Sequence, residues 1–418
     1  MIFQGRWHAT SYALSLKDSS LSVAINGDYI LVCDLAGRLY SVYQAGRHQR
    51  RSLSGQVLQK WTPPVGTTTE RQRRWFTQAE VDLLLDEAAR HFRQLHAALP
   101  TPAWEWVTPP DRASALDELL HVIERAGRFD SGRARADAAR FAKVYSPIGI
   151  LPPDQYLALV LQATTGCSFN TCTFCDLYHQ PFRVKTPAEF RRHLHEVREY
   201  LGASILLRQR SIFLGAANAL AIPLPRLLPL LEIIQEELRP SPQPLSLEGR
   251  GTRSGGEVYA FLDAFTGTRK SVENYRALAE RGLRRVYIGL ESGHDPLLEF
   301  VRKPGHARDA IETVQAIKAA GINIGLIVLI GLGGERFAAG HAADTIAVLN
   351  QLHLDTGDLL YFSDLVEEPG APYPVLAAQL GIRALTAPER AAQRNTLRSG
   401  LRPSGVKISN YDVREFVY

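Results

Sequence analysis

The chain has 418 residues, of which 45% are hydrophobic and 22% are charged. This length suggests two or three domains, and the composition excludes a disordered or fibrous protein because it supplies enough apolar material for a sizeable core. No apolar run reaches the roughly 18 residues that a membrane span needs, and the first twenty residues do not resemble a secretory signal. We therefore expect a cytoplasmic protein with no membrane partner.

The formal net charge is +5, and arginine supplies most of the positive charge. Basic residues gather toward the N-terminus, as in GRHQRRSLSG at 46–55. A basic surface favours anionic partners without identifying them. Two interpretations stay open at this point: an anionic small-molecule substrate, or a nucleic acid bound by the N-terminal region.

The N-terminal part of the chain reads as short strands followed by helices. Residues 21–43 contain apolar runs separated by NGD and AGR, which are typical of hairpin turns. We predict a small β-rich module at 1–75. Thr77 followed by Glu80 forms a capping box at the start of a helix, and residues 112–145 also have a helical pattern. A helical connector is therefore predicted at 76–154.

From residue 155 onward, short apolar runs alternate with amphipathic segments, a pattern typical of βα units around a parallel sheet. Six such units fit an incomplete barrel better than a closed barrel of eight. The predicted fold class is therefore α/β, with a partial TIM-like (β/α)6 barrel at 155–365 and a C-terminal extension at 366–418. Ligands in such folds bind at the carboxyl ends of the strands. The predicted strands are 157–163, 210–215, 257–262, 285–290, 322–330 and 358–365, and the predicted helices are roughly 187–201, 223–238, 271–282, 306–320 and 340–352, with a less regular helical region after 374.

Three of the four cysteines, Cys167, Cys172 and Cys175, fall within nine residues just after the first predicted strand of the barrel. Clustered cysteines in a reducing compartment more often bind metal than form disulfides. With His179 as a fourth ligand, the thiolates could close a tetrahedral zinc site. An iron–sulfur cluster held by three cysteines would instead leave one iron open to a ligand, and the position at a strand end favours this alternative.

The stretch CSFNTCTFC resembles the cysteine signature of the radical S-adenosylmethionine (radical SAM) superfamily, in which an aromatic residue, here Phe174, precedes the last cysteine. Four residues separate the first two cysteines, where the commonest pattern has three. The resemblance covers about residues 155–365. It implies a [4Fe-4S] cluster on the three cysteines and S-adenosylmethionine on the open iron. It also implies reductive cleavage of that cosubstrate to a 5′-deoxyadenosyl radical, which abstracts hydrogen from an unidentified organic substrate that we expect to be anionic.

The same resemblance implies further contacts to the cosubstrate. Gly215 would bind its amino group through the backbone, and Asn218 is a nearby side-chain candidate. Glu291 would hold the ribose, since a carboxylate accepts hydrogen bonds from both hydroxyls, and Ser292 would shape the same wall. Ile330 would contact the adenine.

These assignments have structural alternatives. Asn218 could belong to an ordinary strand-to-helix turn, and Glu291 could form a salt bridge to Arg302 or Lys303. Residues that could face the substrate, or could equally cap helices, are Tyr178, His179, Asp263, Ser363 and Asp364.

Cys33 lies in the apolar run YILVCDL and is expected to be a buried structural thiol, so no second cluster can be built from cysteine. The resemblance further implies an external electron donor of the flavodoxin or ferredoxin type. It assigns no catalytic residue and no reaction subclass. Two alternatives remain: a radical SAM enzyme that modifies tRNA, and a non-catalytic binding protein with a zinc-stapled barrel. The aromatic residues that would stack on tRNA are Trp7, Tyr40, Tyr43 and Trp61.

Overall fold

The computed structural model describes the chain except for residues 64–70, 111–112, 179, 239–255, 369 and 403. The chain divides into two compact units. The first unit consists of Met1–Ser146, His195–Gln209 and Val417–Tyr418, and the second of Pro147–Leu194 and Arg210–Phe416. None of the helices in the described part of the chain has both the length and the hydropathy needed to cross a membrane.

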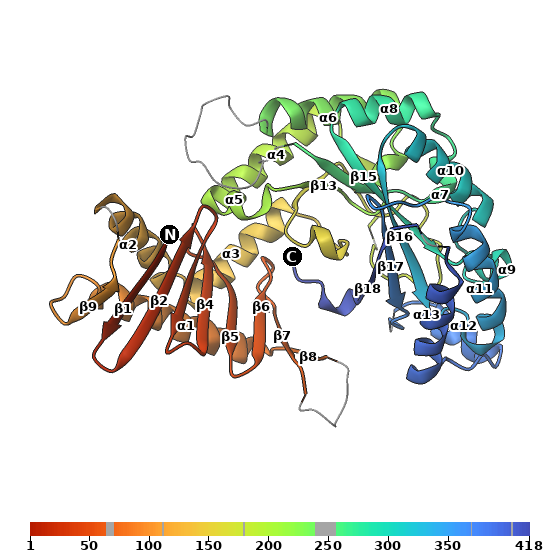
Figure 1. Cartoon of the computed structure of the whole chain (residues 1–418). Helices are drawn as coiled ribbons and strands as arrows, with labels where there is room; N and C mark the ends of the chain where they lie inside the picture. The colour runs from red at the N-terminus through yellow and green to blue at the C-terminus, as the bar shows by residue number, and fades with distance from the viewer. Residues whose placement is uncertain (64–70, 111–112, 179, 239–255, 369, 403) are drawn as a thin grey trace. The chain divides into compact units, whose positions relative to one another are not determined.

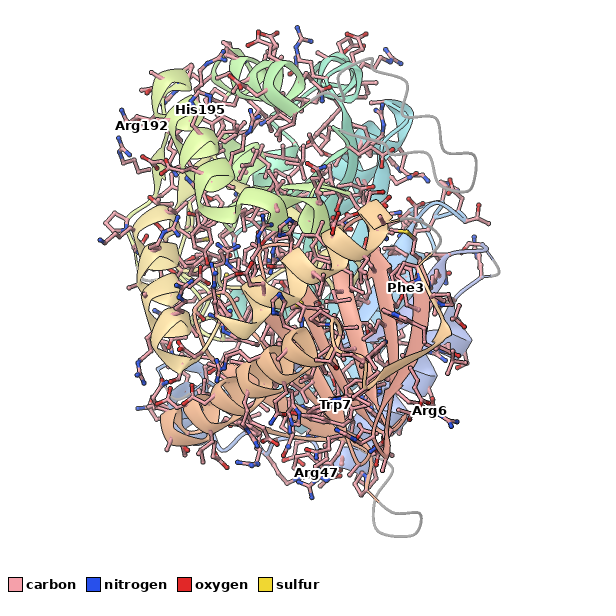
Figure 2. The ribbon with its side chains drawn as sticks, turned by 90° about the vertical axis from the view of Figure 1, so that its left-hand side faces the viewer. Phe3, Arg6, Trp7, Arg47, Arg192 and His195 are labelled. Carbon is pink, nitrogen blue, oxygen red and sulfur yellow. The ribbon has the colours of Figure 1, made fainter. Side chains whose placement is uncertain are left out.

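An antiparallel sheet organises the first unit (Figure 1). Its strands are β1 (Ile2–Trp7), β2 (Thr10–Lys17), β3 (Ser20–Ile25), β4 (Tyr29–Asp34), β5 (Leu39–Gln44), β6 (Arg47–Arg51), β7 (Val57–Trp61), β8 (Gln72–Trp75) and β9 (Trp104–Thr108). They lie in the order β8-β7-β6-β5-β4-β3-β2-β1-β9. Buried side chains alternate with more exposed ones along β1, β2 and β3: on β1, Phe3 is buried and Arg6 is exposed (Figure 2). The sheet therefore has one apolar face.

Helices cover this apolar face. The helix α1 (Gln78–Ala98) contributes Leu85 and Phe92 to the same core as the strands, and it begins with the predicted capping box of Thr77 and Glu80. The other helices of the unit are α2 (Ala113–Gly127), α3 (Ser131–Val144) and the short α5 (Ile205–Arg208).

The strand β9 was not predicted: the sequence indicated a helical connector at 76–154, with helices from Thr77 and at 112–145, and no strand between them. It pairs with β1, and its Trp104 is buried in the core. The reason is visible in the residues WEWVT, whose aromatic side chains alternate with polar ones at the two-residue period of a strand.

A parallel sheet organises the second unit. Its strands are β10 (Leu159–Gln162), β13 (Ile212–Gly215), β14 (Val258–Phe261), β15 (Leu283–Glu291), β16 (Asn323–Ile330), β17 (Leu359–Asp364) and β18 (Lys407–Tyr411). Their order in space is their order in the chain, and every neighbouring pair is parallel. All residues of β10 and β13 are buried, as expected for a parallel sheet covered on both faces.

Helices follow the strands of this sheet, and Figure 1 shows α6, α8 and α10 along its outer side. The helices are α4 (Pro187–Leu201), whose first part belongs to this unit, α6 (Leu224–Leu238), α7 (Ala264–Gly267), α8 (Val272–Glu280), α9 (Asp295–Phe300), α10 (Ala307–Ala319), α11 (Gly334–Leu349), α12 (Tyr373–Gln379) and α13 (Ala387–Gly400). The predicted α/β fold with a partial barrel is confirmed. The described sheet is open, with β10 and β18 at its edges, and β18 is a seventh strand beyond the six predicted.

Candidate active site

A cavity of about 260 Å³ lies at the carboxyl end of the parallel sheet. All three clustered cysteines line it, and each strand from β13 to β18 contributes residues near, at or just beyond its carboxyl end. This is the edge at which α/β folds of this class bind their ligands. The cavity therefore lies where the sequence predicted the active site, at the carboxyl ends of the strands and beside the three cysteines.

The cysteines occupy a loop that is closed at its base by two short strands. β11 (Thr164–Thr165) pairs antiparallel with β12 (Arg183–Val184) in a separate two-stranded sheet, so the two ends of the loop lie side by side. Gly166 follows β11 with a φ of +67°, and a Cβ there would come within 2.1 Å of the carbonyl oxygen of Gln180. A side chain at 166 would therefore force the two arms of the loop apart.

The far end of the loop is anchored to the end of α9. The backbone N–H of Thr173 donates to the carbonyl oxygen of Val301 at 2.9 Å, and the hydroxyl of Thr171 donates to that of Arg302 at 3.2 Å. The next residue is Lys303, which lines the cavity. These bonds fix the position of the cysteine loop relative to Lys303.

The three cysteines of the loop are free and half-buried. Burial raises the pKa of the Cys172 thiol to about 11, although the ammonium of Lys303 acts in the opposite direction, and burial also raises the pKa of Cys175. Such thiols become thiolates when a metal binds them. Each thiolate of a four-iron cluster binds a different iron, so three cysteines around one cavity fit that group.

The zinc alternative requires four ligands around one ion. Within the described residues, no group of three or more His, Cys, Asp or Glu side chains surrounds a single metal-ion position. His179, the proposed fourth ligand, lies outside the described residues. The four-ligand zinc set therefore stays a prediction.

Glu291 lines the cavity and is paired with Lys303, whose Nζ lies 3.4 Å from its Oε1. Glu291 thus forms the salt bridge that was considered as an alternative, and it also lines the cavity. Burial raises the pKa of Glu291 and Lys303 opposes this effect. For Lys303, burial lowers the pKa, but the negative charges of Glu291, Cys172 and Asp263 together outweigh this effect, so the net shift is upward. No described residue binds Oε2 of Glu291, which leaves an acceptor for a ligand hydroxyl.

The backbone directs this carboxylate into the cavity. β15 has a bulge between Gly289 and Glu291 where it pairs with β16, and Glu291 has a φ of +59°. Bulges near active sites redirect side chains, and a left-handed conformation at a residue other than glycine costs free energy that the surroundings must offset. Glu291 therefore lies in a strained position whose result is to place a carboxylate at the cavity.

Asn218 is buried and connects the cysteine loop to α7. Its amide nitrogen donates to Ser168 Oγ at 2.8 Å and to the carboxylate of Asp263, and its Oδ1 accepts from the backbone N–H of Asp263 at 3.2 Å. Asp263 also accepts from the N–H of Thr266 and thereby caps α7. Both residues line the cavity, so each combines the structural role considered from the sequence with a position at the candidate site.

Three other predicted cosubstrate contacts lie outside the lining of this cavity. Gly215 is buried at the end of β13, where an added Cβ would make ordinary contacts with Val160 at 3.5 Å and Gln162 at 3.7 Å. Ser292 is fully buried, and its Oγ lies 2.7 Å from Nδ1 of His341. Ile330 is fully buried in β16. The structure thus brings Phe174, Asn218 and Glu291 to the cavity with the cysteines, and it leaves these three away from it.

The predicted substrate-facing residues Tyr178, Asp263, Ser363 and Asp364 line the cavity. Sequence reasoning missed Glu368, in the segment after β17, and Tyr411, at the end of β18. The rule that ligands meet strand ends could have identified Glu368, because it follows the last predicted strand by three residues. No strand was predicted at 407–411, so the sequence offered no such signal for Tyr411.

The four aromatic residues of the tRNA alternative lie in the first unit. The guanidinium of Arg50 lies 5.0 Å from the ring centre of Tyr40, and that of Arg47 lies 5.3 Å from the ring centre of Trp61. One face of each of these two rings therefore already has a cation–π partner. RNA binding by this unit stays a prediction.

Residues 161–339 match the model of the Radical SAM superfamily. No curated protein matches the chain. Solved structures that match the chain include the cobalamin-dependent S-adenosylmethionine radical enzyme OxsB with aqua-cobalamin bound, which is 13% identical with a TM-score of 0.37 over 65% of this chain and 33% of that one. The radical S-adenosylmethionine methyltransferase TsrM from Kitasatospora setae is 16% identical with a TM-score of 0.39 over 53% of this chain and 37% of that one.

Coproporphyrinogen III oxidase (HemN) from Escherichia coli, described as a radical SAM enzyme, is 14% identical with a TM-score of 0.40 over 62% of this chain and 54% of that one. The chain thus spans between about a third and about half of the length of these three proteins. The matched family region begins in β10 and ends in α11, so it contains the cysteine loop and the strand that carries Glu291.

Proposed function

The chain carries a radical SAM domain at residues 161–339, and from this premise we propose that it is an enzyme acting on an organic substrate held in the cavity at the strand ends. Proteins of this superfamily bind a [4Fe-4S] cluster and S-adenosylmethionine. When bound, the cluster supplies the electron that cleaves the cosubstrate to methionine and a 5′-deoxyadenosyl radical, which abstracts hydrogen from a C–H bond. The observation that carries the proposal is that all three cysteines of the motif open onto one cavity.

The chain's own residues would hold and shield these groups. Cys167, Cys172 and Cys175 would ligate the cluster, and the free carboxylate oxygen of Glu291 would accept hydrogen bonds from the ribose. Phe174 packs against a group of buried apolar residues that includes Leu297 and Val301. From there it would shield one side of the iron–sulfur cluster from water. An external donor of the flavodoxin or ferredoxin type would supply the electron.

The first experiment reconstitutes the protein with iron and sulfide without air, adds S-adenosylmethionine and dithionite, and measures 5′-deoxyadenosine by chromatography. We expect cleavage by the wild-type protein and none by Cys172→Ala, because the cluster loses a ligand. Cys33→Ala is the matched control, since Cys33 is fully buried in the core of the first unit and should leave cleavage unchanged.

Two results would contradict this proposal. One is a Cys172→Ala variant that keeps both the iron–sulfur absorption and the cleavage reaction. The other is a protein purified without air that contains stoichiometric zinc and takes up neither iron nor sulfide, which would support the zinc-stapled binding protein instead.

A further inference from the structure

The wall of the cavity has an excess of negative charge. Among the described residues that line it, one is a cation, Lys303, and five are carboxylates. The carboxylates are Asp176, Asp263, Glu291, Asp364 and Glu368. A site with this balance favours a cationic ligand unless its own side chains already neutralise the carboxylates.

Four of the five carboxylates already interact with the chain. Glu291 is paired with Lys303, Asp263 binds Asn218 and the start of α7, and Asp176 also has an interaction partner. Asp364 accepts a hydrogen bond from Arg394 and forms an ion pair with Arg390, whose Nε lies 3.5 Å away. These four carboxylates therefore already have interaction partners within the chain, and two of them, Glu291 and Asp364, are paired with cations.

Glu368 is the exception. It is half-buried on the cavity wall, and its carboxylate has no hydrogen bond or ion pair with any described residue. Only its backbone carbonyl is used, as the acceptor for the N–H of Ala371 at 3.0 Å. A partly buried carboxylate without a partner has lost hydration that a bound cation would replace.

A second polar group on the same wall also lacks a partner. The hydroxyl of Ser363 on β17 is buried, with the residue 1% exposed, and it has no hydrogen-bond partner among the described residues. A buried hydroxyl left in this state costs free energy, and such groups generally mark a site for water or a ligand. Since Ser363 lines the cavity, a ligand there can supply the missing bond.

The rest of this wall is apolar. Ile327 and Leu329 of β16, Leu365 and Val366 after β17, and Val413 after β18 all line the cavity. None of them is a residue that the superfamily resemblance assigned to the cosubstrate. They would bury the hydrocarbon part of a ligand whose polar atoms reach Ser363 and Glu368.

Building on the proposed function, we propose that the substrate is a largely apolar amine, with its ammonium on the carboxylate of Glu368, a hydrogen bond to Ser363 and its hydrocarbon part against β16, β17 and β18. This replaces the expectation of an anionic substrate. That expectation rested on basic residues concentrated near the N-terminus, and the described cavity wall carries only one cation, already paired with Glu291.

The test uses three probes of one shape: 4-phenylbutylamine, 4-phenylbutan-1-ol and 4-phenylbutanoate. Calorimetry on the full chain, loaded with cluster and S-adenosylmethionine, measures their binding without turnover. We expect the amine to bind about tenfold more tightly than the alcohol, which is the size expected for one charge-assisted hydrogen bond, and the carboxylate to bind more weakly than either.

Variants locate the effect. Glu368→Gln should remove the tenfold preference for the amine, and Ser363→Ala should weaken the amine and the alcohol alike. Glu367→Gln is the matched control, because it removes the same charge from the exposed neighbouring residue and should change nothing.

The proposal is overturned if the carboxylate binds as well as the amine, if the amine does not bind measurably, or if Glu368→Gln keeps the preference. It is also overturned if Glu368→Gln weakens S-adenosylmethionine binding and leaves the probes unaffected, since Glu368 would then contact the cosubstrate. These outcomes are separate from the cleavage assay. A protein that prefers the amine yet forms no 5′-deoxyadenosine would keep the amine site and lose the radical function.

Discussion

Glu291 shows how a single residue serves two demands at the candidate site. Its left-handed backbone places the carboxylate at the cavity, and Lys303 compensates the charge that burial would otherwise destabilise. The partner is a lysine twelve residues away, beyond the end of α9. The strain and the ion pair together hold one carboxylate oxygen free toward the cavity.

Replacing Glu291 with alanine should weaken the binding of S-adenosylmethionine by at least about tenfold while the iron content stays at the wild-type level. The reason is that the change removes the acceptor for the ribose hydroxyls and touches no cysteine. Equilibrium binding of the cosubstrate to the reconstituted protein, with iron analysis on the same sample, measures both quantities.

Glu299→Ala is the control for this experiment, since Glu299 is an exposed carboxylate on α9 and does not line the cavity. Unchanged affinity in Glu291→Ala would remove Glu291 from the cosubstrate site. A loss of iron would show instead that the Glu291–Lys303 pair mainly supports the cysteine loop.

At the scale of elements, the cysteine loop depends on the pairing of β11 with β12. This pairing brings residues on either side of the loop together and crowds the backbone at Gly166. The three cysteines are therefore held by a closed loop, which reduces the entropy that the chain loses when a cluster binds.

Replacing Gly166 with alanine should lower the iron bound per chain after reconstitution, with the far-ultraviolet circular dichroism unchanged. The added Cβ would overlap the carbonyl oxygen of Gln180, and opening the loop to relieve this overlap costs about 1–3 kcal/mol. Iron and sulfide analysis of the reconstituted variant measures the effect.

Gly202→Ala separates the overlap from backbone strain. Gly202 also has a positive φ, of +54°, but an added Cβ there would meet no atom within 4 Å. We expect this control to bind iron normally, since it carries only the cost of a left-handed alanine. Equal iron loss in both variants would mean that general destabilisation, and not the closed loop, explains the result.

The edge strand β18 shows which elements escape prediction from sequence. Its residues KISNY lack the continuous apolar run that marks the central strands, because an edge strand is less covered. Its position beside β17 nevertheless brings Tyr411 and Val413 to the cavity wall. The strands and helices with strong periodicity, from β10 to α11, were predictable, and the weakly patterned ones were not.

At the scale of the whole molecule, the chain contributes three separate segments to the first unit. A buried polar network joins two of them. Arg38 donates through Nε to Asp137 at 2.9 Å and through its other nitrogens to the carbonyl oxygens of Tyr200 and Leu201. Arg51 lies 3.5 Å from the same carboxylate. Asp137 therefore balances two buried guanidinium groups.

Replacing Asp137 with alanine should destabilise the first unit by about 3–5 kcal/mol, because it leaves buried Arg51 without its carboxylate and leaves Arg38 with only Asp34, 4.0 Å away. Denaturant unfolding followed by tryptophan fluorescence measures the change. This signal reports on the first unit alone, since all five tryptophans lie within it. They are Trp7, Trp61, Trp75, Trp104 and Trp106.

Glu124→Ala provides the comparison, because Glu124 forms an exposed ion pair with Arg128 one helical turn away in the chain. Exposed pairs of this kind contribute at most about 1 kcal/mol. If both variants lose the same free energy, the buried network does not contribute as described.

The sequence alone determined the α/β class, most of the strands of the second unit and the three cysteines. These features are local: strand and helix periods repeat within a few residues, and the cysteines are close together in the chain. Glu291 was also accessible, because it directly follows a predicted strand and ligands meet strand ends.

Only the tertiary structure decided which side chains share the cavity. Tyr411 lies more than two hundred residues from the cysteines in the chain. Glu368 stands out only because the other carboxylates on the wall have interaction partners, while it has none among the residues that the structure describes. Pairings between distant segments depend on how the strands lie side by side, and a lone charge is recognised by what surrounds it in space. Neither the arrangement of the strands nor the surroundings of a charge can be read from the spacing of residues along the chain.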